Sequence, residues 1–136
     1  MDYLPKLPGL LPKWLLFISA VSVFNSAQSY FGGLHLTRRV YDGPAATAGV
    51  TGLSARTFGT WTFITSVVRF YGAYHLNDPA VFSLTYATFI VALVHFSSEW
   101  LIYKTTKFGK GLLGPLIVST TSLVWLTLQK EFYLGL

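Results

Sequence analysis

Four apolar segments account for most of the chain. They cover residues 14–31, 57–76, 80–103 and 112–129, and each is 18 to 24 residues long. A helix that rises about 1.5 Å per residue needs about 20 residues to cross a hydrocarbon core of roughly 30 Å. The pattern therefore predicts an all-α membrane protein, a four-transmembrane-helix bundle that forms a single polytopic domain over residues 1–136.

Proline, glycine and polar residues separate the four segments. Gly32 and Gly33 end the first segment, and residues 34–55 form the longest polar stretch. The sequence Asn77-Asp78-Pro79 is typical of a tight turn, so the second and third helices are expected to form an antiparallel hairpin. Helix faces and loops are therefore the surfaces with which the protein must act.

The composition agrees with a membrane protein. Hydrophobic residues make up 52% of the chain and charged residues 11%, whereas a soluble domain usually carries about 25% charged residues. The absence of cysteine excludes disulfides and cysteine-ligated metals. Most of the ten Lys and Arg residues lie near helix ends, which indicates contact with lipid headgroups, and no nucleic-acid partner is expected.

The distribution of positive charge predicts an orientation. The first and third loops share one side of the bundle, and the termini share the other side with the Asn77 turn. Positively charged residues favour the first side by six to three: Arg38, Arg39, Arg56, Lys104, Lys107 and Lys110 against Lys6, Lys13 and Lys130. The positive-inside rule then places the basic loops in the cytosol.

Hydroxyl groups form a stripe along the first helix. Its members are spaced three, four and three residues apart, so they share one face: Ser19, Ser22, Ser26 and Ser29. Small and hydroxylated residues allow membrane helices to approach closely and to form hydrogen bonds with each other. The stripe is consistent with packing inside the bundle, with a homodimer interface, or with a polar pathway through the membrane.

Apart from His75 at the end of a segment, three residues with acidic or basic side chains fall within the apolar segments, where a charge costs at least about 2.5–3.5 kcal/mol. They are Arg69, His95 and Glu99. In the predicted hairpin Arg69 and Glu99 differ in depth by roughly 18 Å, so they should not meet, and Arg56 is the expected partner of Glu99. For Arg69 three possibilities remain: it extends to the near interface, bonds the serines of the first helix, or contacts a neighbouring protein.

The chain lacks the motifs of the main membrane enzymes. Its histidines, His35, His75 and His95, are 40 and 20 residues apart, which excludes the clustered ligands of di-iron oxidases. No glycine-rich nucleotide-binding motif or P-loop is present. These observations predict a protein that is not an enzyme and that needs no cofactor or metal.

Several sequence stretches, taken in order, resemble one family. The chain is similar to the ergosterol biosynthetic protein 28 family from about residue 11 to residue 132. The stretches that carry the resemblance are 11–18 (LPKWLLFI), 55–61 (ARTFGTW), 69–75 (RFYGAYH), 77–79 (NDP), 95–100 (HFSSEW), 115–120 (PLIVST) and 122–125 (SLVW).

The resemblance implies a multi-pass protein of the endoplasmic-reticulum membrane without known catalytic activity. It implies a scaffold that tethers the enzymes of sterol C-4 demethylation: a C-4 sterol methyl oxidase, a sterol C-3 dehydrogenase/decarboxylase and a 3-keto sterol reductase, with a sterol 24-C-methyltransferase also associated. No catalytic residues transfer. The alternative is a sterol-binding carrier or transporter with an apolar cavity in the bundle or in a dimer.

Two regions are the leading candidates for contact with partner proteins. The first is the loop that begins with Arg38 and Arg39 and ends at Arg56. The second is the corner formed by Arg56, Glu99 and Trp100, with His95 on the same helical face as Glu99. Further candidates are Trp61, Arg69 and Tyr74. The same residues could instead serve only to hold the bundle together, and the sequence leaves this choice open.

Overall fold

A computed structural model describes residues 4–43, 46 and 49–135, and within these residues it contains helices and no strands. The helices are α1 (Leu11–Phe31), α2 (His35–Val40), α3 (Gly52–His75), α4 (Pro79–Leu101), α5 (Lys110–Leu128) and α6 (Lys130–Leu134). The all-helical class predicted from the sequence is confirmed. The four predicted segments correspond to α1, α3, α4 and α5, with ends that differ by a few residues.

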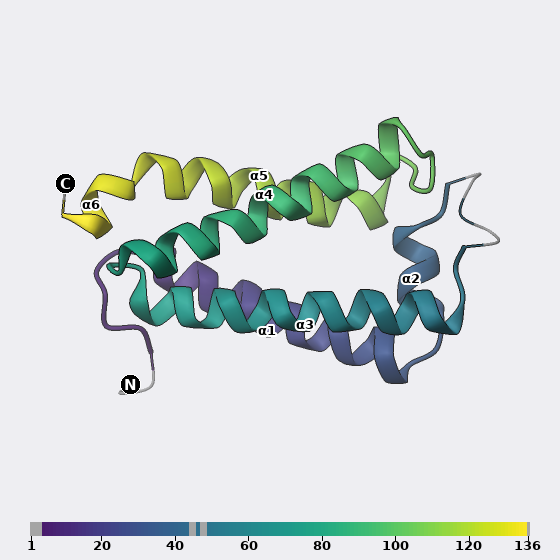
Figure 1. Cartoon of the computed structure of the whole chain (residues 1–136), viewed down its shortest axis with the longest axis horizontal. Coiled ribbons are helices and arrows are strands. Elements are labelled where there is room, and N and C mark those ends of the chain that lie inside the picture. The colour runs from purple at the N-terminus through teal and green to yellow at the C-terminus, as the bar shows by residue number, and fades with distance from the viewer. Residues whose placement is uncertain (1–3, 44–45, 47–48, 136) are drawn as a thin grey trace.

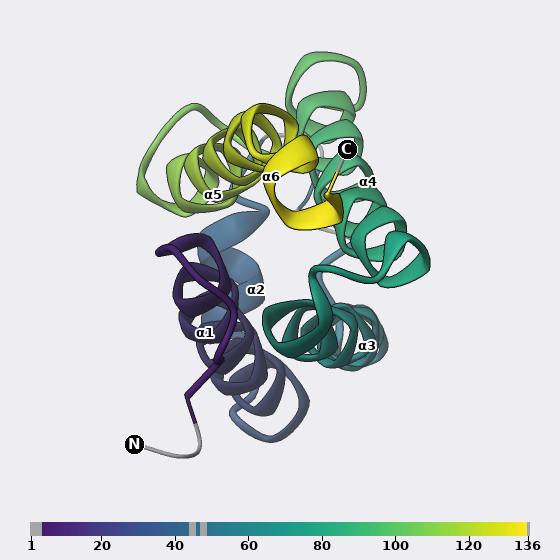
Figure 2. The same cartoon turned by 90° about the vertical axis from the view of Figure 1, so that its left-hand side faces the viewer.

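The four long helices run side by side in two layers (Figure 1). One layer is formed by α1 and α3, and the other by α4 and α5. The end-on view places α1, α3, α4 and α5 around a common centre (Figure 2). A hydrogen bond of 2.9 Å from Trp14 Nε1 on α1 to Ser122 Oγ on α5 joins the first and last long helices. The long helices thus form a closed ring.

The interface between α1 and α3 is built from small residues. Ser19, Ser26 and Ser29 of α1 are buried, and the Ser26 hydroxyl donates a 2.5 Å hydrogen bond to the carbonyl oxygen of Gly59 on α3. A side chain at Gly59 would press on the α1 backbone. Most of the serine stripe is therefore used inside the chain. The expected homodimer through this face lacks a free surface, because α3 already covers it.

The turn between α3 and α4 has the predicted geometry. Asp78 is the N-cap of α4, and its carboxylate accepts hydrogen bonds from the backbone N–H groups of Ala80 and Val81 at 2.9 and 3.4 Å. Such a cap satisfies N–H groups that have no partner within the helix. One turn from the end of α3, Gly72 allows close approach to Thr85 of α4. The predicted antiparallel hairpin is confirmed.

The first and third loops meet at one end of the bundle, as the order of the four predicted helices implied. The backbone N–H of Gly43 donates to the carbonyl of Thr105 at 2.9 Å, and the N–H of Lys107 donates to the carboxylate of Asp42 at 2.9 Å. At the other end the Tyr133 hydroxyl of α6 donates to the carbonyl of Pro8 at 2.7 Å. The two ends of the bundle are each closed by contacts between distant parts of the chain.

Two features of the helices were missed. The helix predicted to begin at residue 57 begins at Gly52, because Thr51 and Ser54 form a capping box in which each side chain bonds the backbone N–H of the other. The predicted loop 34–55 also contains α2, which has six residues. So short a helix gives no clear periodicity in the sequence.

Within the described residues, two helices are long and apolar enough to cross a membrane, namely Pro79–Leu101 and Gly111–Leu128. The other two long helices carry more polar residues. Asn25 and Gln28 lie on α1, and Arg56 and Arg69 lie on α3. The structure therefore supports an all-helical bundle with two apolar spans, and the prediction of four spans is not confirmed by helix composition.

Candidate functional site: a cavity between α2, α3 and α4

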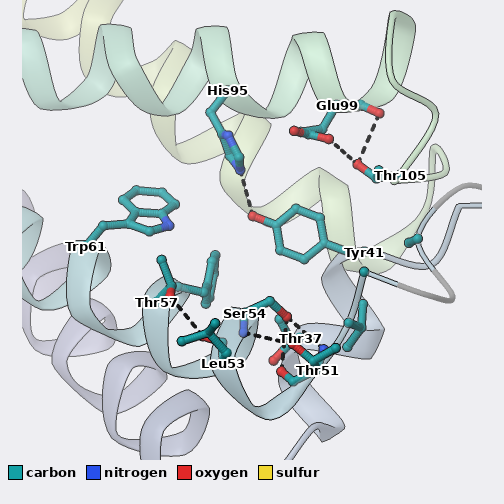
Figure 3. A pocket seen from close by; sticks show the side chains of 14 residues that line it. Thr37, Tyr41, Thr51, Leu53, Ser54, Thr57, Trp61, His95, Glu99 and Thr105 are labelled. Atoms are coloured by element: carbon teal, nitrogen blue, oxygen red, sulfur yellow. Dashed lines mark hydrogen bonds between the residues drawn. The ribbon is translucent and has the colours of Figure 1, made fainter.

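A cavity of about 470 Å³ lies where α2, the beginning of α3 and the end of α4 meet (Figure 3). This volume falls in the range of about 300–1,000 Å³ that is usual for small-molecule sites. The described residues that line it are Thr37, Tyr41, Ala46, Gly49, Val50, Thr51, Leu53, Ser54, Thr57, Phe58, Trp61, His95, Glu99 and Thr105.

Aromatic rings form one wall of the cavity. The ring of Tyr41 meets that of Phe58 edge-on with centroids 5.7 Å apart, and Phe58 meets Trp61 in the same way at 5.4 Å. Trp61 also contacts the imidazole of His95, at 5.5 Å. Because each ring is held by its neighbours, the wall is a preformed apolar surface.

Polar groups gather on the side formed by α4. The Tyr41 hydroxyl and His95 Nε2 share a hydrogen bond of 2.6 Å, and the Glu99 carboxylate accepts a hydrogen bond from the Thr105 hydroxyl. Burial, assisted by the negative charge of Glu99, raises the pKa of Tyr41 above its usual value of 10.0. The phenol therefore remains protonated at neutral pH, and the cavity presents one hydroxyl and one carboxylate near each other.

Thr37 lines the same cavity but keeps its hydroxyl oxygen buried. Its side chain is 1% exposed, and its hydroxyl has no hydrogen-bond partner anywhere in the described part of the chain. Buried polar side chains in proteins are normally hydrogen-bonded. The oxygen of Thr37 has almost no accessible surface, so the Thr37 hydroxyl does not open into the cavity, and Ser29 and Thr106 carry buried hydroxyls that likewise have no partner among the residues that the structure describes.

The predicted ion pair between Arg56 and Glu99 is not present among the described residues. The carboxylate of Glu99 bonds Thr105, in the loop that follows α4, while Arg56 is exposed and its guanidinium lies near Gly52 on its own helix. The two residues lie at the same end of the bundle, as predicted. Depth alone does not decide which way a side chain points around the helix axis, and this is why the predicted pair was wrong.

Arg69 lies in the middle of the bundle, away from the corner. It is 6% exposed, and its Nε donates a hydrogen bond of 3.1 Å to the Thr88 hydroxyl of α4. The guanidinium carbon also stands 3.9 Å from the centre of the Phe89 ring. Of the predicted possibilities, internal bonding is correct, but the partner is α4, whereas the prediction named the serines of α1.

Arg69 also borders a second, smaller cavity of about 210 Å³. The residues around it come from all four long helices and include the polar side chains of Ser22, Asn25, Thr62 and Ser119. This cavity is too small for a large lipid. Ser22, the member of the serine stripe that is not fully buried, faces it.

Comparison with known proteins identifies the family. Residues 11–124 match the family described as Erg28 like protein. The chain belongs to the Erg28-like protein family. Ergosterol biosynthetic protein 28 of Saccharomyces cerevisiae is 62% identical, over 97% of this chain and 86% of the relative. The protein of the same name from Candida albicans is 60% identical, over 93% of this chain and 90% of the relative.

The similarity extends to animals. Ergosterol biosynthetic protein 28 homolog of Homo sapiens is 36% identical to this Erg28-like chain, over 85% of the chain and 81% of the relative. No solved structure matches the chain significantly. The family resemblance expected from the sequence is thus confirmed.

The Erg28-like structure brings three of the predicted site residues together: Trp61, His95 and Glu99 line one cavity. The other predicted residues are elsewhere. Arg38 and Arg39 are exposed on α2, and the ring of Trp100 meets that of Phe108 at a tilt, with centroids 5.3 Å apart. Tyr74 lies toward the opposite end of the bundle and contacts Phe70.

Tyr41 and Thr37 are among the cavity residues that the sequence did not single out. Both lie in the segment that was expected to be loop, so no helical pattern pointed to them. The described residues contain no group of three or more His, Cys, Asp or Glu side chains that could hold a metal ion.

Proposed function

We propose that this chain is a non-catalytic scaffold in the membrane of the endoplasmic reticulum, where it tethers the enzymes of sterol C-4 demethylation. Membership of a family whose relatives are named ergosterol biosynthetic proteins carries this proposal. The expected partners are a C-4 sterol methyl oxidase, a sterol C-3 dehydrogenase/decarboxylase, a 3-keto sterol reductase and a sterol 24-C-methyltransferase.

Physical reasoning supports a tether. Sterol intermediates dissolve in the bilayer, so each release dilutes them before the next enzyme acts. Holding the enzymes together raises the effective concentration of the next enzyme near each intermediate, and this requires no new chemistry. Among the groups that could act chemically, Tyr41 and His95 are hydrogen-bonded to each other, and the Glu99 carboxylate accepts a hydrogen bond from Thr105.

The bundle offers two kinds of surface to such partners. Large apolar side chains are exposed on the outside of all four long helices, among them Phe24, Ile64, Val94 and Ile117. In the proposed arrangement α1, α3, α4 and α5 all cross the membrane, and these side chains meet lipid or partner helices. The exposed Arg38 and Arg39 on α2 are available to the cytosolic parts of the enzymes.

A gene deletion combined with affinity purification tests the scaffold. Cells that lack the protein should accumulate sterols with methyl or carboxyl groups at C-4, and the tagged protein should co-purify in mild detergent with the demethylation enzymes. A tagged membrane protein of similar size from the same membrane is the control for non-specific recovery. A normal sterol profile, with none of these enzymes recovered above the control, would overturn the proposal.

A sterol carrier remains the second candidate, and the cavity of about 470 Å³ is the observation that favours it. A carrier must release its ligand as well as bind it. The purified protein should therefore move a fluorescent sterol between two populations of vesicles faster than the sterol moves unaided. Binding without faster transfer would exclude the carrier and leave the scaffold.

A further inference from the structure

We propose that the cavity between α2, α3 and α4 binds one uncharged sterol alcohol, with the sterol hydroxyl at the polar side formed by Tyr41, His95 and Glu99. The identity of the ligand rests on the proposed function in sterol biosynthesis. The shape and chemistry of the cavity are observed independently of that function.

The walls suit a rigid apolar molecule. Tyr41, Phe58 and Trp61 supply aromatic rings to the lining, and Val50 and Leu53 supply aliphatic side chains. Leu53 is exposed at 69% although it is large and apolar. A fused ring system packs against such a surface with little loss of conformational entropy, because it has few rotatable bonds to fix.

The polar side selects for a hydroxyl group. The Glu99 carboxylate can only accept hydrogen bonds, whereas the protonated Tyr41 hydroxyl can both donate and accept. A sterol hydroxyl also both donates and accepts, so it can complete this arrangement.

The same groups discriminate against acids. A carboxylated sterol would bring a negative charge toward Glu99, and like charges repel strongly where water is partly excluded. The exposed arginines Arg38 and Arg39 do not line the cavity and do not offset this repulsion inside it. The cavity should therefore hold neutral sterol alcohols in preference to their carboxylated derivatives.

Binding can be measured with the full chain in phosphatidylcholine nanodiscs. Dehydroergosterol, a fluorescent sterol alcohol, accepts energy from tryptophan, so binding appears as saturable energy transfer. Its 3-acetate, which has no hydroxyl proton, should bind at least about tenfold more weakly. The 3-hemisuccinate, which carries a carboxylate, should bind weakly to the native chain and more tightly to Glu99→Gln.

Two matched variants show whether the binding occurs in this cavity. Thr57 and Thr60 are both exposed on α3, and each hydroxyl bonds the carbonyl four residues earlier, but only Thr57 lines the cavity. Thr57→Phe should abolish saturable binding, whereas Thr60→Phe should leave it unchanged. The helical circular dichroism of both variants should equal that of the native chain.

The outcomes separate this proposal from the scaffold. Equal binding by Thr57→Phe and the native chain, or equal affinity for dehydroergosterol and its acetate, would overturn the cavity site. If the demethylation enzymes still co-purify in that case, only the sterol site fails. If sterol binds as expected but no enzymes co-purify, the site stands and the scaffold fails.

Discussion

Arg69 on α3 and Thr88 on α4 are joined by a 3.1 Å hydrogen bond, and they stand nine residues before and ten residues after Asp78. Nearly equal distances from the turn place both at the same depth in the hairpin. The guanidinium is further supported by the Phe89 ring at 3.9 Å. A buried cation without an acidic partner among the described residues is thus held by a hydroxyl, a carbonyl and an aromatic face.

Removing this cation should weaken the bundle. Arg69→Gln loses the hydrogen bond to Thr88 and the contact with Phe89, and a hydrogen bond to a charged group contributes about 1.5–3 kcal/mol. The free energy of unfolding, measured by circular dichroism in mixed micelles, should fall by about that amount. Arg56→Gln is the matched control on the same helix, and because Arg56 is exposed its effect should stay within about 0.5 kcal/mol. Equal effects of the two changes would contradict the buried role of Arg69.

Two glycines within helices should respond oppositely to alanine. A Cβ at Gly72 would overlap the Thr85 hydroxyl, whereas a Cβ at Gly114 meets nothing within 4 Å. Gly72→Ala should therefore destabilise the protein by about 1–3 kcal/mol through overpacking. Gly114→Ala should be neutral or should stabilise it by up to about 1 kcal/mol, because alanine favours helix. Unfolding of both variants under the same conditions checks the prediction.

Stability should fall in alkaline solution because of Tyr41. Its pKa is higher in the folded protein than the usual 10.0, so above that pH the unfolded chain loses the phenol proton first. The unfolded state then binds fewer protons than the folded state, and the free energy of unfolding decreases as pH rises. Tyr41→Phe should lose less stability than the native chain between pH 8 and pH 11. Tyr30→Phe, which changes an exposed tyrosine, should behave as the native chain does.

The chain contains no cysteine, so single cysteines can report the membrane arrangement. In the proposed four-span arrangement, His35→Cys and Lys107→Cys lie on the cytosolic side, and Lys6→Cys and Asn77→Cys lie in the lumen. A membrane-impermeant maleimide should label the first two variants in sealed microsomes and the other two only after detergent is added. If His35→Cys and Asn77→Cys react alike while Lys107→Cys differs, only α4 and α5 cross the membrane.

The sequence predicted the features that depend on spacing along the chain. The long helices, the hairpin at Asp78 and the meeting of the first and third loops all follow from segment length and turn residues. The separation of Arg69 and Glu99 followed from the same arithmetic, since their distances from the turn differ. These features depend only on the number of residues between two positions. The known rise per residue of a helix converts that number into a difference in depth along the bundle.

The features that depend on direction around a helix axis were not predictable in this way. Arg56 and Glu99 lie at the same end of the bundle but do not form an ion pair. The pairing of Thr88 with Arg69 was not predicted, because threonine is common in apolar helices and does not indicate a partner for a buried cation. Tyr41 was overlooked because it follows the short helix α2. The cavity depends on how α2 packs against α3 and α4, which no local pattern specifies.

The hydrogen bond from Tyr133 to the carbonyl of Pro8 joins positions 125 residues apart. A ribosome releases the first of these positions long before the second is made. The segment before α1 therefore has no such partner until α6 has left the ribosome. A chain that stops short of α6 lacks this hydrogen bond, and the segment before α1 then has no Tyr133 to hold it.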